Sequence, residues 1–250
     1  MPTKNSDKSK PSPTSSPTFS SASSASSASS ASSASSASEI SDKRQNFARL
    51  WNLLKNEYPE AKPALNYGNP LELLIATVLS AQCTDSQVNK VTEHLFKKYK
   101  SVADYAFADP QELETEIYST GFYRQKAKNI IKTSRILLEK YDSRVPQTME
   151  ELVSLPGVGR KTANIVLARG FGIIEGIAVD THVKRLSNRL GFSRNFDPVK
   201  IERDLIALAK KEELDSLSMT LIHHGRKVCQ ARKPKCAECL LNQLCPSSTV

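Results

Sequence analysis

A lysine that follows a glycine-rich turn is the residue of this chain whose spacing most clearly suggests chemistry. In "LPGVGRKTA", residues 155–163, a Pro-Gly-x-Gly turn leads directly to Lys161. Gly157 and Gly159 let the backbone turn tightly and approach a partner closely. A turn that ends at a helix N-terminus presents free N–H groups, which favour a phosphate. The spacing therefore predicts an anion-binding turn beside an amine that can attack carbon.

Two plainer interpretations of this turn stay open. The glycines can form an ordinary corner between two helices, and Lys161 can be one more phosphate contact. Asp180 in "IAVDTHV" favours the chemical interpretation. Cleaving a base from its sugar passes through a cation-like sugar that a carboxylate stabilises, and a carboxylate can take a proton from an attacking group. Asp180 also stands where a helix N-cap belongs, and both roles can hold because a capping Asp is rigidly aimed.

Four cysteines make a second chemical pattern, with spacing C-x6-C-x2-C-x5-C. The chain has no secretory signal, so a metal or cluster site is favoured over a disulfide scaffold. Four thiolates in one loop can hold a zinc ion or a cubane iron–sulfur cluster. Zinc fingers usually use paired short spacings, and only one short pair exists here, which favours the cluster. The four are Cys229, Cys236, Cys239 and Cys245, and the basic residues Arg232, Lys233 and Lys235 lie between the first two.

Helices are expected to position nearly all of these groups. In residues 45–59 an apolar face combines Phe47, Leu50, Trp51 and Leu54 at helical spacing. Other segments show amphipathic spacing or the uniform apolarity of a buried helix, and no alternating run is long enough to force a sheet. These segments are 69–82, 85–99, 124–141, 148–172, 179–192, 197–211 and 214–229.

The N-terminal segment differs in composition from the rest. Residues 1–38 are mostly Ser, Ala, Pro and Lys, so we expect a disordered tail over residues 1–42. The net charge of the chain is +9; the three Lys and one Asp of residues 1–38 supply +2, which leaves +7 elsewhere. That charge favours a polyanionic partner. No run of about 18 apolar residues exists, so no membrane span or membrane partner is expected.

Together these residues resemble the endonuclease III family of DNA base-excision repair enzymes. "LPGVGRKTANIVL" is similar to its helix–hairpin–helix signature, "VDTHV" to its aspartate motif, and the cysteine spacing to its [4Fe-4S] loop. "LLIATVLSAQCTD" and "GFYRQKAKNI" are similar to its other two DNA-facing segments, and the resemblance covers about residues 44–246. It implies an all-α fold of two helical domains with a DNA-binding cleft between them. Residues 63–173 would form a six-helix barrel domain with the helix–hairpin–helix motif, and residues 43–62 and 174–250 an iron–sulfur cluster domain.

The resemblance also implies a bifunctional DNA glycosylase and AP lyase. Lys161 matches the family nucleophile, and Asp180 its activating carboxylate. Gln82 matches a residue that fills the gap left by an extruded nucleotide. Phe122 stands where the family often has a Leu inserted into the duplex; the departure changes the shape of the wedge but not its principle. The other DNA contacts are expected at Gly157, Gly159, Arg160, Thr162 and Lys233.

The implied substrates are oxidised or ring-saturated pyrimidines such as thymine glycol, together with abasic sites. After base loss the strand would be cut 3′ to the lesion by β-elimination through a Schiff base. The expected partner is double-stranded DNA with a damaged base or an abasic site, and the expected protein is a monomer. The resemblance places it in a bacterial cytoplasm, associated with the nucleoid.

Three other functions compete with this interpretation. An adenine glycosylase of the same superfamily shares the cysteine loop but usually lacks the hairpin lysine and has a further C-terminal domain, whereas this chain ends five residues after Cys245. A non-catalytic DNA-binding module would not need Lys161 and Asp180 together. A zinc ribbon protein that binds RNA does not fit the cysteine spacing.

Overall fold

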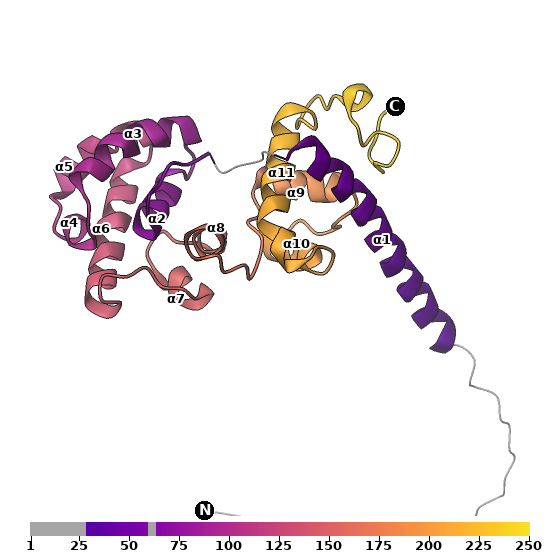
Figure 1. The fold of residues 1–250 in the computed structure, drawn as a ribbon, viewed down its shortest axis with the longest axis horizontal. Coiled ribbons are helices and arrows are strands. Elements are labelled where there is room, and N and C mark those ends of the chain that lie inside the picture. The colour runs from indigo at the N-terminus through magenta and orange to yellow at the C-terminus, as the bar shows by residue number, and fades with distance from the viewer. Residues whose placement is uncertain (1–28, 60–63) are drawn as a thin grey trace, which may run out of the picture. The chain divides into compact units, whose positions relative to one another are not determined.

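Every regular element in the part of the chain that the structure describes is a helix, and the expected all-α class is confirmed there (Figure 1). This structure is a computed structural model, and it describes residues 29–59 and 64–250. The α-helices are α1 (Ser29–Glu57), α2 (Pro70–Leu79), α3 (Asp85–Lys98), α4 (Val102–Ala106), α5 (Pro110–Glu116), α6 (Tyr123–Lys140), α7 (Met149–Ser154), α8 (Arg160–Phe171), α9 (Thr181–Arg189), α10 (Pro198–Ile206) and α11 (Leu214–Lys227). The 3-10 helices are η1 (Tyr118–Thr120), η2 (Lys211–Glu213) and η3 (Cys236–Glu238). Within the described ranges, no helix has both the length and the apolarity to cross a membrane.

Helix α1 begins inside the segment for which the composition predicts disorder, residues 1–42. Residues 1–28 lie outside the described residues, but residues 29–42 are helical. This stretch contains no Gly or Pro, and its repeat places an Ala at every third position from 31 to 37. Because Ala has the highest helix propensity of any residue, a chain that lacks the apolar residues for a core can still be helical. The lack of large apolar residues in this segment bears on core packing, whereas its helix depends on the local backbone preference of Ala.

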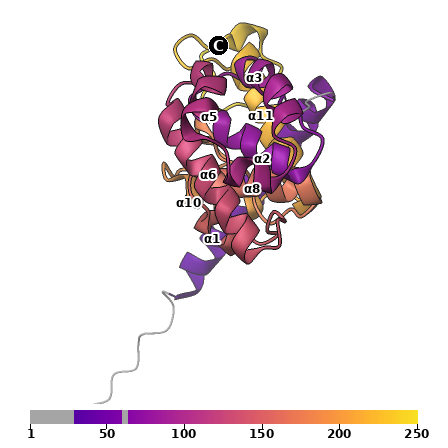
Figure 2. The same cartoon turned by 90° about the vertical axis from the view of Figure 1, so that its left-hand side faces the viewer.

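A first hydrophobic core is built from residues 64–173. Helix α2 runs through it with Leu73, Leu74 and Leu79 completely buried, as its uniform apolarity predicted. It lies against α6 and α8 (Figure 2). Residues 64–173 contain the α-helices α2 to α8. The shortest of them is the five-residue α4, which a reciprocal capping box between Ser101 and Asp104 stabilises.

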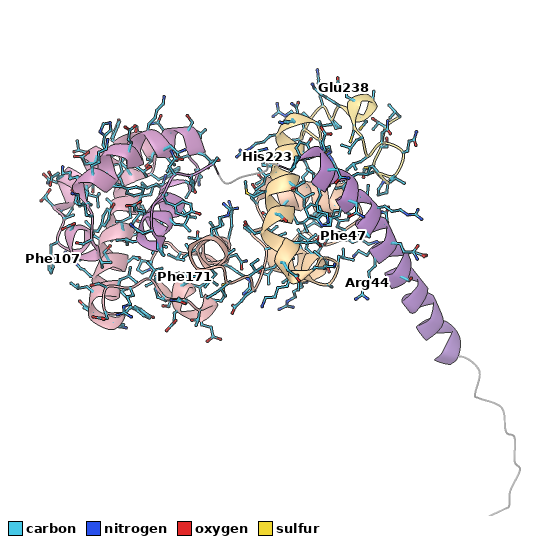
Figure 3. All side chains as sticks on the ribbon, in the orientation of Figure 1. Arg44, Phe47, Phe107, Phe171, His223 and Glu238 are labelled. Carbon is cyan, nitrogen blue, oxygen red and sulfur yellow. The ribbon has the colours of Figure 1, made fainter. Side chains whose placement is uncertain are left out.

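A second hydrophobic core combines α1 with α9, α10 and α11. The predicted apolar face of α1 lies in it: Phe47, Leu50, Trp51 and Leu54 are at most 3% exposed. Phe47, labelled on α1 in Figure 3, is one of these residues. Its ring packs edge-on against that of Phe192, with ring centroids 4.9 Å apart. The N-terminal helix α1 therefore packs with helices from the C-terminal part of the chain, and not with the helices that directly follow it.

The two cores belong to one compact unit, residues 41–250. Ile173 packs on the first core and Ile174 on the second, so the chain passes from one to the other directly after α8. Ion pairs join residues of the two parts: Arg160–Glu202, Arg169–Asp215 at 3.0 Å and Arg226–Asp85 at 3.3 Å. Two of these pairs start from α8, directly before the segment that carries Asp180.

Candidate functional site

The predicted glycine turn lies between α7 and α8. Gly157 has φ +79°, and a Cβ at this position would lie 2.6 Å from the side-chain nitrogen of Asn129. Gly159 is the N-cap of α8 with an extended backbone, and no side chain caps the helix there. The first N–H groups of α8 therefore lack a side-chain acceptor, which is the arrangement that binds a phosphate.

The two glycines should respond differently to replacement by alanine. Gly157→Ala places a side chain in the left-handed region and against Asn129, so we expect the free energy of unfolding to fall by about 1–2 kcal/mol. Gly159→Ala should cost less stability, because its φ is −91° and no atom lies within 4 Å of the new Cβ. Urea denaturation of both variants measures the difference, and equal losses would contradict the assignment.

Lys161 is the second residue of α8, and its side chain is exposed. It makes no ion pair with any residue in ranges 29–59 and 64–250. An exposed amine without a carboxylate partner is free to meet an electrophile or a phosphate. Thr162, the next predicted contact, is half-buried on the same helical turn.

Asp180 is the N-cap of α9, as its position in the sequence predicted. Its Oδ1 accepts hydrogen bonds from the backbone N–H groups of His182 and Val183, both at 2.8 Å. These bonds orient the carboxylate, and they do not use Oδ2. The residue is half-buried, so the second oxygen can serve a bound molecule while the first caps the helix.

His182 lies close to both of these residues, and the sequence analysis did not single it out. Burial is the largest influence on the pKa of His182 and lowers it, the Asp180 carboxylate opposes this shift, and Lys161 is among the cations that add to it. Arg185 Nη2 donates to Nδ1 of the ring at 3.2 Å, which requires that nitrogen to be unprotonated. The structure thus gathers an amine, an oriented carboxylate and a neutral imidazole, and the "VDTHV" motif itself was the available signal.

Arg160 has a protein partner that the sequence did not reveal. Its Nε donates to Oε2 of Glu202 at 2.5 Å, and Nδ2 of Asn164 donates to Oε1 of the same carboxylate at 2.8 Å. Glu202 is only 3% exposed. Gly176 is needed beside it, because a Cβ there would collide with both Glu202 and Asn164. Arg160 is therefore part of a buried polar network, although 46% of its side chain stays exposed for a phosphate.

Gln82 and Phe122, the predicted duplex-inserting residues, share an unusual backbone. Gln82 has φ 54° and Phe122 has φ 49°, both in the left-handed region. Gln82 follows the end of α2, and Phe122 precedes the first residue of α6. Both side chains are exposed, Phe122 by 66%. An exposed phenylalanine at the tip of a tight turn has the form of a wedge.

The four cysteines of the C-terminal loop line one cavity of about 160 Å³. All four are half-buried free thiols. Arg189 crosses this loop: its Nη1 donates to Sγ of Cys229 at 3.3 Å, and its guanidinium also binds the carbonyls of Gln230 and Ala231. Lys233 is exposed on the same loop. The cysteine spacing did not predict this contact with Arg189.

The chemistry of the cysteine cavity fits a cationic centre. Burial raises the pKa of Cys239 and Cys245, and the nearby Cys229 thiol raises both further. Positive charge among the thiols would offset that cost. Four thiols that line one cavity are a ligand set suited to a cubane iron–sulfur cluster.

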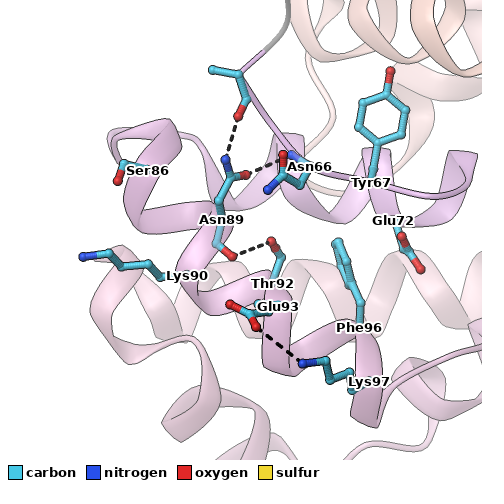
Figure 4. A pocket seen from close by; sticks show the side chains of 11 residues that line it. Asn66, Tyr67, Glu72, Ser86, Asn89, Lys90, Thr92, Glu93, Phe96 and Lys97 are labelled. Carbon is cyan, nitrogen blue, oxygen red and sulfur yellow. Dashed lines mark hydrogen bonds and ion pairs between the residues drawn. The ribbon is translucent and has the colours of Figure 1, made fainter.

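A larger cavity of about 840 Å³ lies elsewhere, against α3 and the segment before α2 (Figure 4). Asn89 crosses it by accepting from the backbone N–H of Asn66 and donating to the carbonyl of Ala64. None of the residues that we predicted to be functional lines it. The cavity is therefore separate from the candidate site.

Family comparisons agree with this site. Residues 75–211 match the model of the HhH-GPD superfamily base excision DNA repair proteins. Residues 229–245 match the iron–sulfur binding domain of endonuclease III. The chain belongs to the endonuclease III family. It is accordingly a DNA glycosylase and AP lyase of base excision repair, with a [4Fe-4S] cluster as cofactor and DNA as partner.

Individual relatives match over most of their length. The chain is 53% identical to endonuclease III of Synechocystis over 84% of this chain and 95% of that protein. It is 43% identical to endonuclease III of Escherichia coli K12 over 77% and 90%. A solved structure of a trapped endonuclease III–DNA covalent intermediate matches with a TM-score of 0.78 and 45% identity, over 82% of this chain and 96% of that one. A non-covalent endonuclease III–DNA complex matches with the same TM-score and identity.

Proposed function

We propose that this enzyme removes oxidised pyrimidines of the thymine glycol type from double-stranded DNA and then cuts the strand 3′ to the abasic site. Lys161 is the nucleophile, and Asp180 is the carboxylate that activates it. The observation that carries the proposal is that the exposed Lys161 amine, with no ion-pair partner among the described residues, and Asp180, whose Oδ1 is fixed by the cap of α9, are both close enough to His182 to shift its pKa. A trapped covalent intermediate of a relative with DNA supports a covalent route.

In the first step the Nζ atom of Lys161 attacks C1′ of the damaged nucleotide. The glycosidic C1′–N bond breaks, and its electron pair leaves with the base, which then takes up a proton. The Asp180 carboxylate stabilises the cation-like sugar and accepts a proton from the attacking amine. The sugar ring opens to a Schiff base between Lys161 and C1′.

In the second step the Schiff base makes the C2′ proton acidic. A base removes this proton, the electrons form the C2′–C3′ double bond, and the C3′–O bond breaks with its electron pair on the departing phosphate. Water then hydrolyses the Schiff base and returns the lysine. The neutral ring of His182, close to both residues, is available to carry a proton between them.

DNA binding is proposed to use the hairpin and the two strained loops. The uncapped N–H groups of α8 bind a phosphate, Gln82 fills the space left by the extruded nucleotide, and Phe122 enters the duplex as an apolar wedge. The remaining phosphate contacts are Gly157, Gly159, the exposed part of Arg160, Thr162 and Lys233. The protein acts as a monomer in the bacterial cytoplasm, associated with the nucleoid.

The iron–sulfur cluster is proposed to be held by Cys229, Cys236, Cys239 and Cys245, whose thiols line one cavity. A cluster on these four cysteines would hold the C-terminal loop together, and Lys233 on that loop would contact the DNA backbone. The two proposed domains follow the two cores: residues 63–173 form the barrel domain, and residues 43–62 and 174–250 form the cluster domain.

Affinity for DNA is expected to fall steeply with salt. Because the proposed contacts are mostly with phosphates, a plot of log affinity against log salt should have a slope of about −3 or steeper. Lys233→Gln should reduce the magnitude of that slope by about one, since it removes one phosphate contact. Fluorescence anisotropy between low and physiological salt measures both, and a flat plot would contradict the phosphate contacts.

The experiment that tests the proposed function is borohydride trapping on duplexes with one thymine glycol or one abasic site. A covalent band on both duplexes, absent from Lys161→Ala, is the expected result. A band on the abasic duplex alone would restrict the activity to the lyase step. No band on either, despite tight binding, would overturn the role of Lys161 and favour the monofunctional alternative.

A further inference from the structure

The two proposed duplex-inserting residues stand on backbone that has to be held in place. Within ranges 29–59 and 64–250, four residues other than glycine have a positive φ, and two of them are Gln82 and Phe122. The left-handed region costs an L-residue roughly 1–2 kcal/mol. Such conformations persist where the surrounding structure over-determines them, and they concentrate at functional sites. The backbone conformation at Gln82 and Phe122 therefore requires contacts from the surrounding structure.

Lys126 lies beneath both loops. It is on α6, four residues after Phe122, and it is only 5% exposed. Its Nζ donates to the carbonyl oxygen of Leu79 at 2.7 Å and to that of Thr120 at 2.8 Å. Leu79 is the last residue of α2, three positions before Gln82, and Thr120 lies two positions before Phe122. One ammonium group therefore joins the backbones of the two loops.

The carbonyls that Lys126 binds explain why a cation suits this place. The Leu79 carbonyl belongs to the C-terminal turn of α2, where carbonyls lack partners within the helix and the helix dipole is negative. No described residue forms an ion pair with Lys126. Burial lowers the pKa of Lys126, which expresses the cost of placing an ammonium here. An apolar side chain would fill the same space without the desolvation cost of a buried ammonium, so packing alone does not explain a lysine here.

We propose that Lys126 is a positioning residue that fixes the distance and backbone conformation of the Gln82 and Phe122 loops, so that both side chains enter the duplex together. It touches neither the substrate nor the reacting atoms and acts through the two carbonyls. This inference rests on the proposed function, which assigns Gln82 and Phe122 to the space around the extruded nucleotide.

The test compares two rates in Lys126→Met, which keeps most of the length of the side chain and removes its donors. One rate is excision of thymine glycol from duplex DNA, which requires extrusion. The other is cleavage of single-stranded DNA at an abasic site, which requires only the chemistry. We expect the ratio of duplex to single-strand rates to fall about tenfold or more, because small displacements of positioning groups cost that much. Lys140→Met, at the exposed C-terminal end of α6, is the matched control and should leave the ratio unchanged.

Unstacking can be followed directly with 2-aminopurine placed next to the lesion. The wild-type enzyme should raise its fluorescence and Lys126→Met should not. Lys126→Arg keeps donors for both carbonyls and should restore part of the ratio. An unchanged ratio, or an equal fall of both rates, would overturn the proposal, since a merely structural lysine would affect both substrates alike.

Two further results keep the test decisive. If Lys126→Met does not unfold cooperatively, Lys126→Gln replaces it, because the shorter amide reaches one carbonyl at most. If Lys126→Gln also fails to fold, Lys126 is required for the fold and the proposal is overturned.

Gln82→Ala and Phe122→Ala should each lower the same ratio of duplex to single-strand rates. If these two variants leave the ratio unchanged while the wild-type enzyme excises thymine glycol, the roles assigned to Gln82 and Phe122 are wrong and the proposal for Lys126 is overturned. Absence of wild-type excision and cleavage would instead refute the proposed function itself.

Discussion

Replacing Lys161 with glutamine is expected to abolish strand cleavage while duplex binding remains. The amine is the only group of this side chain that can form a Schiff base, so single-turnover cleavage should fall by about a thousandfold or more. The fold should be unaffected, because Lys161 is exposed and forms no ion pair with the described residues. Loss of one positive charge should weaken duplex binding by less than about tenfold.

Lys233→Gln is the matched control for this variant, since it also neutralises one exposed lysine. It should show the reverse pattern, with weaker binding but unchanged cleavage at saturating enzyme. Quenched-flow cleavage and anisotropy on the same thymine glycol duplex give both quantities. Cleavage retained by a pure Lys161→Gln preparation would show that another nucleophile acts.

Replacing Asp180 with asparagine should separate the two roles of that residue. Asparagine caps a helix about as well as aspartate, so the two hydrogen bonds to the backbone of α9 can form and stability should change little. The amide can neither accept a proton from the amine nor stabilise a cationic sugar. We therefore expect the rate of base excision to fall by about a hundredfold or more, the range of general acid–base catalysis.

Asp180→Ala serves as the comparison for Asp180→Asn. It removes the cap as well as the charge, and it should lose a further 1 kcal/mol or so of stability. Thermal unfolding of the two variants therefore measures the contribution of the helix cap to stability, and single-turnover excision measures the contribution of the carboxylate to the chemistry. If the asparagine variant excises within a few-fold of the wild type, the carboxylate has no chemical role.

Local patterns in the sequence predicted much of this fold. The spacing of Phe47, Leu50, Trp51 and Leu54 predicted a buried face, and all four lie in the second core. The position of Asp180 before an amphipathic run predicted a helix N-cap, and the carboxylate makes the two expected bonds. These predictions succeed because helix periodicity and capping depend on residues close together in the chain.

Other features depend on residues far apart and could not be predicted. Lys126 is buried on α6 together with Ile130 and Leu137, although the amphipathic pattern of residues 124–141 did not single it out. Nothing in that spacing could show that the carbonyls of Leu79 and Thr120 meet there. Glu202 likewise lies on α10, 42 positions from Arg160 along the chain. Such pairings become visible only once the helices are assembled.

The network around Glu202 also limits how members of this family could be recombined. Arg160 and Asn164 come from α8, which also carries Lys161, the proposed nucleophile, whereas Glu202 and Gly176 come from the part of the chain that carries Asp180. A chimera that joins the first half of one protein to the second half of another would have to inherit all four positions as a set. Otherwise the buried Glu202 carboxylate would lose its hydrogen-bond partners where the two halves meet, which would destabilise the chimera.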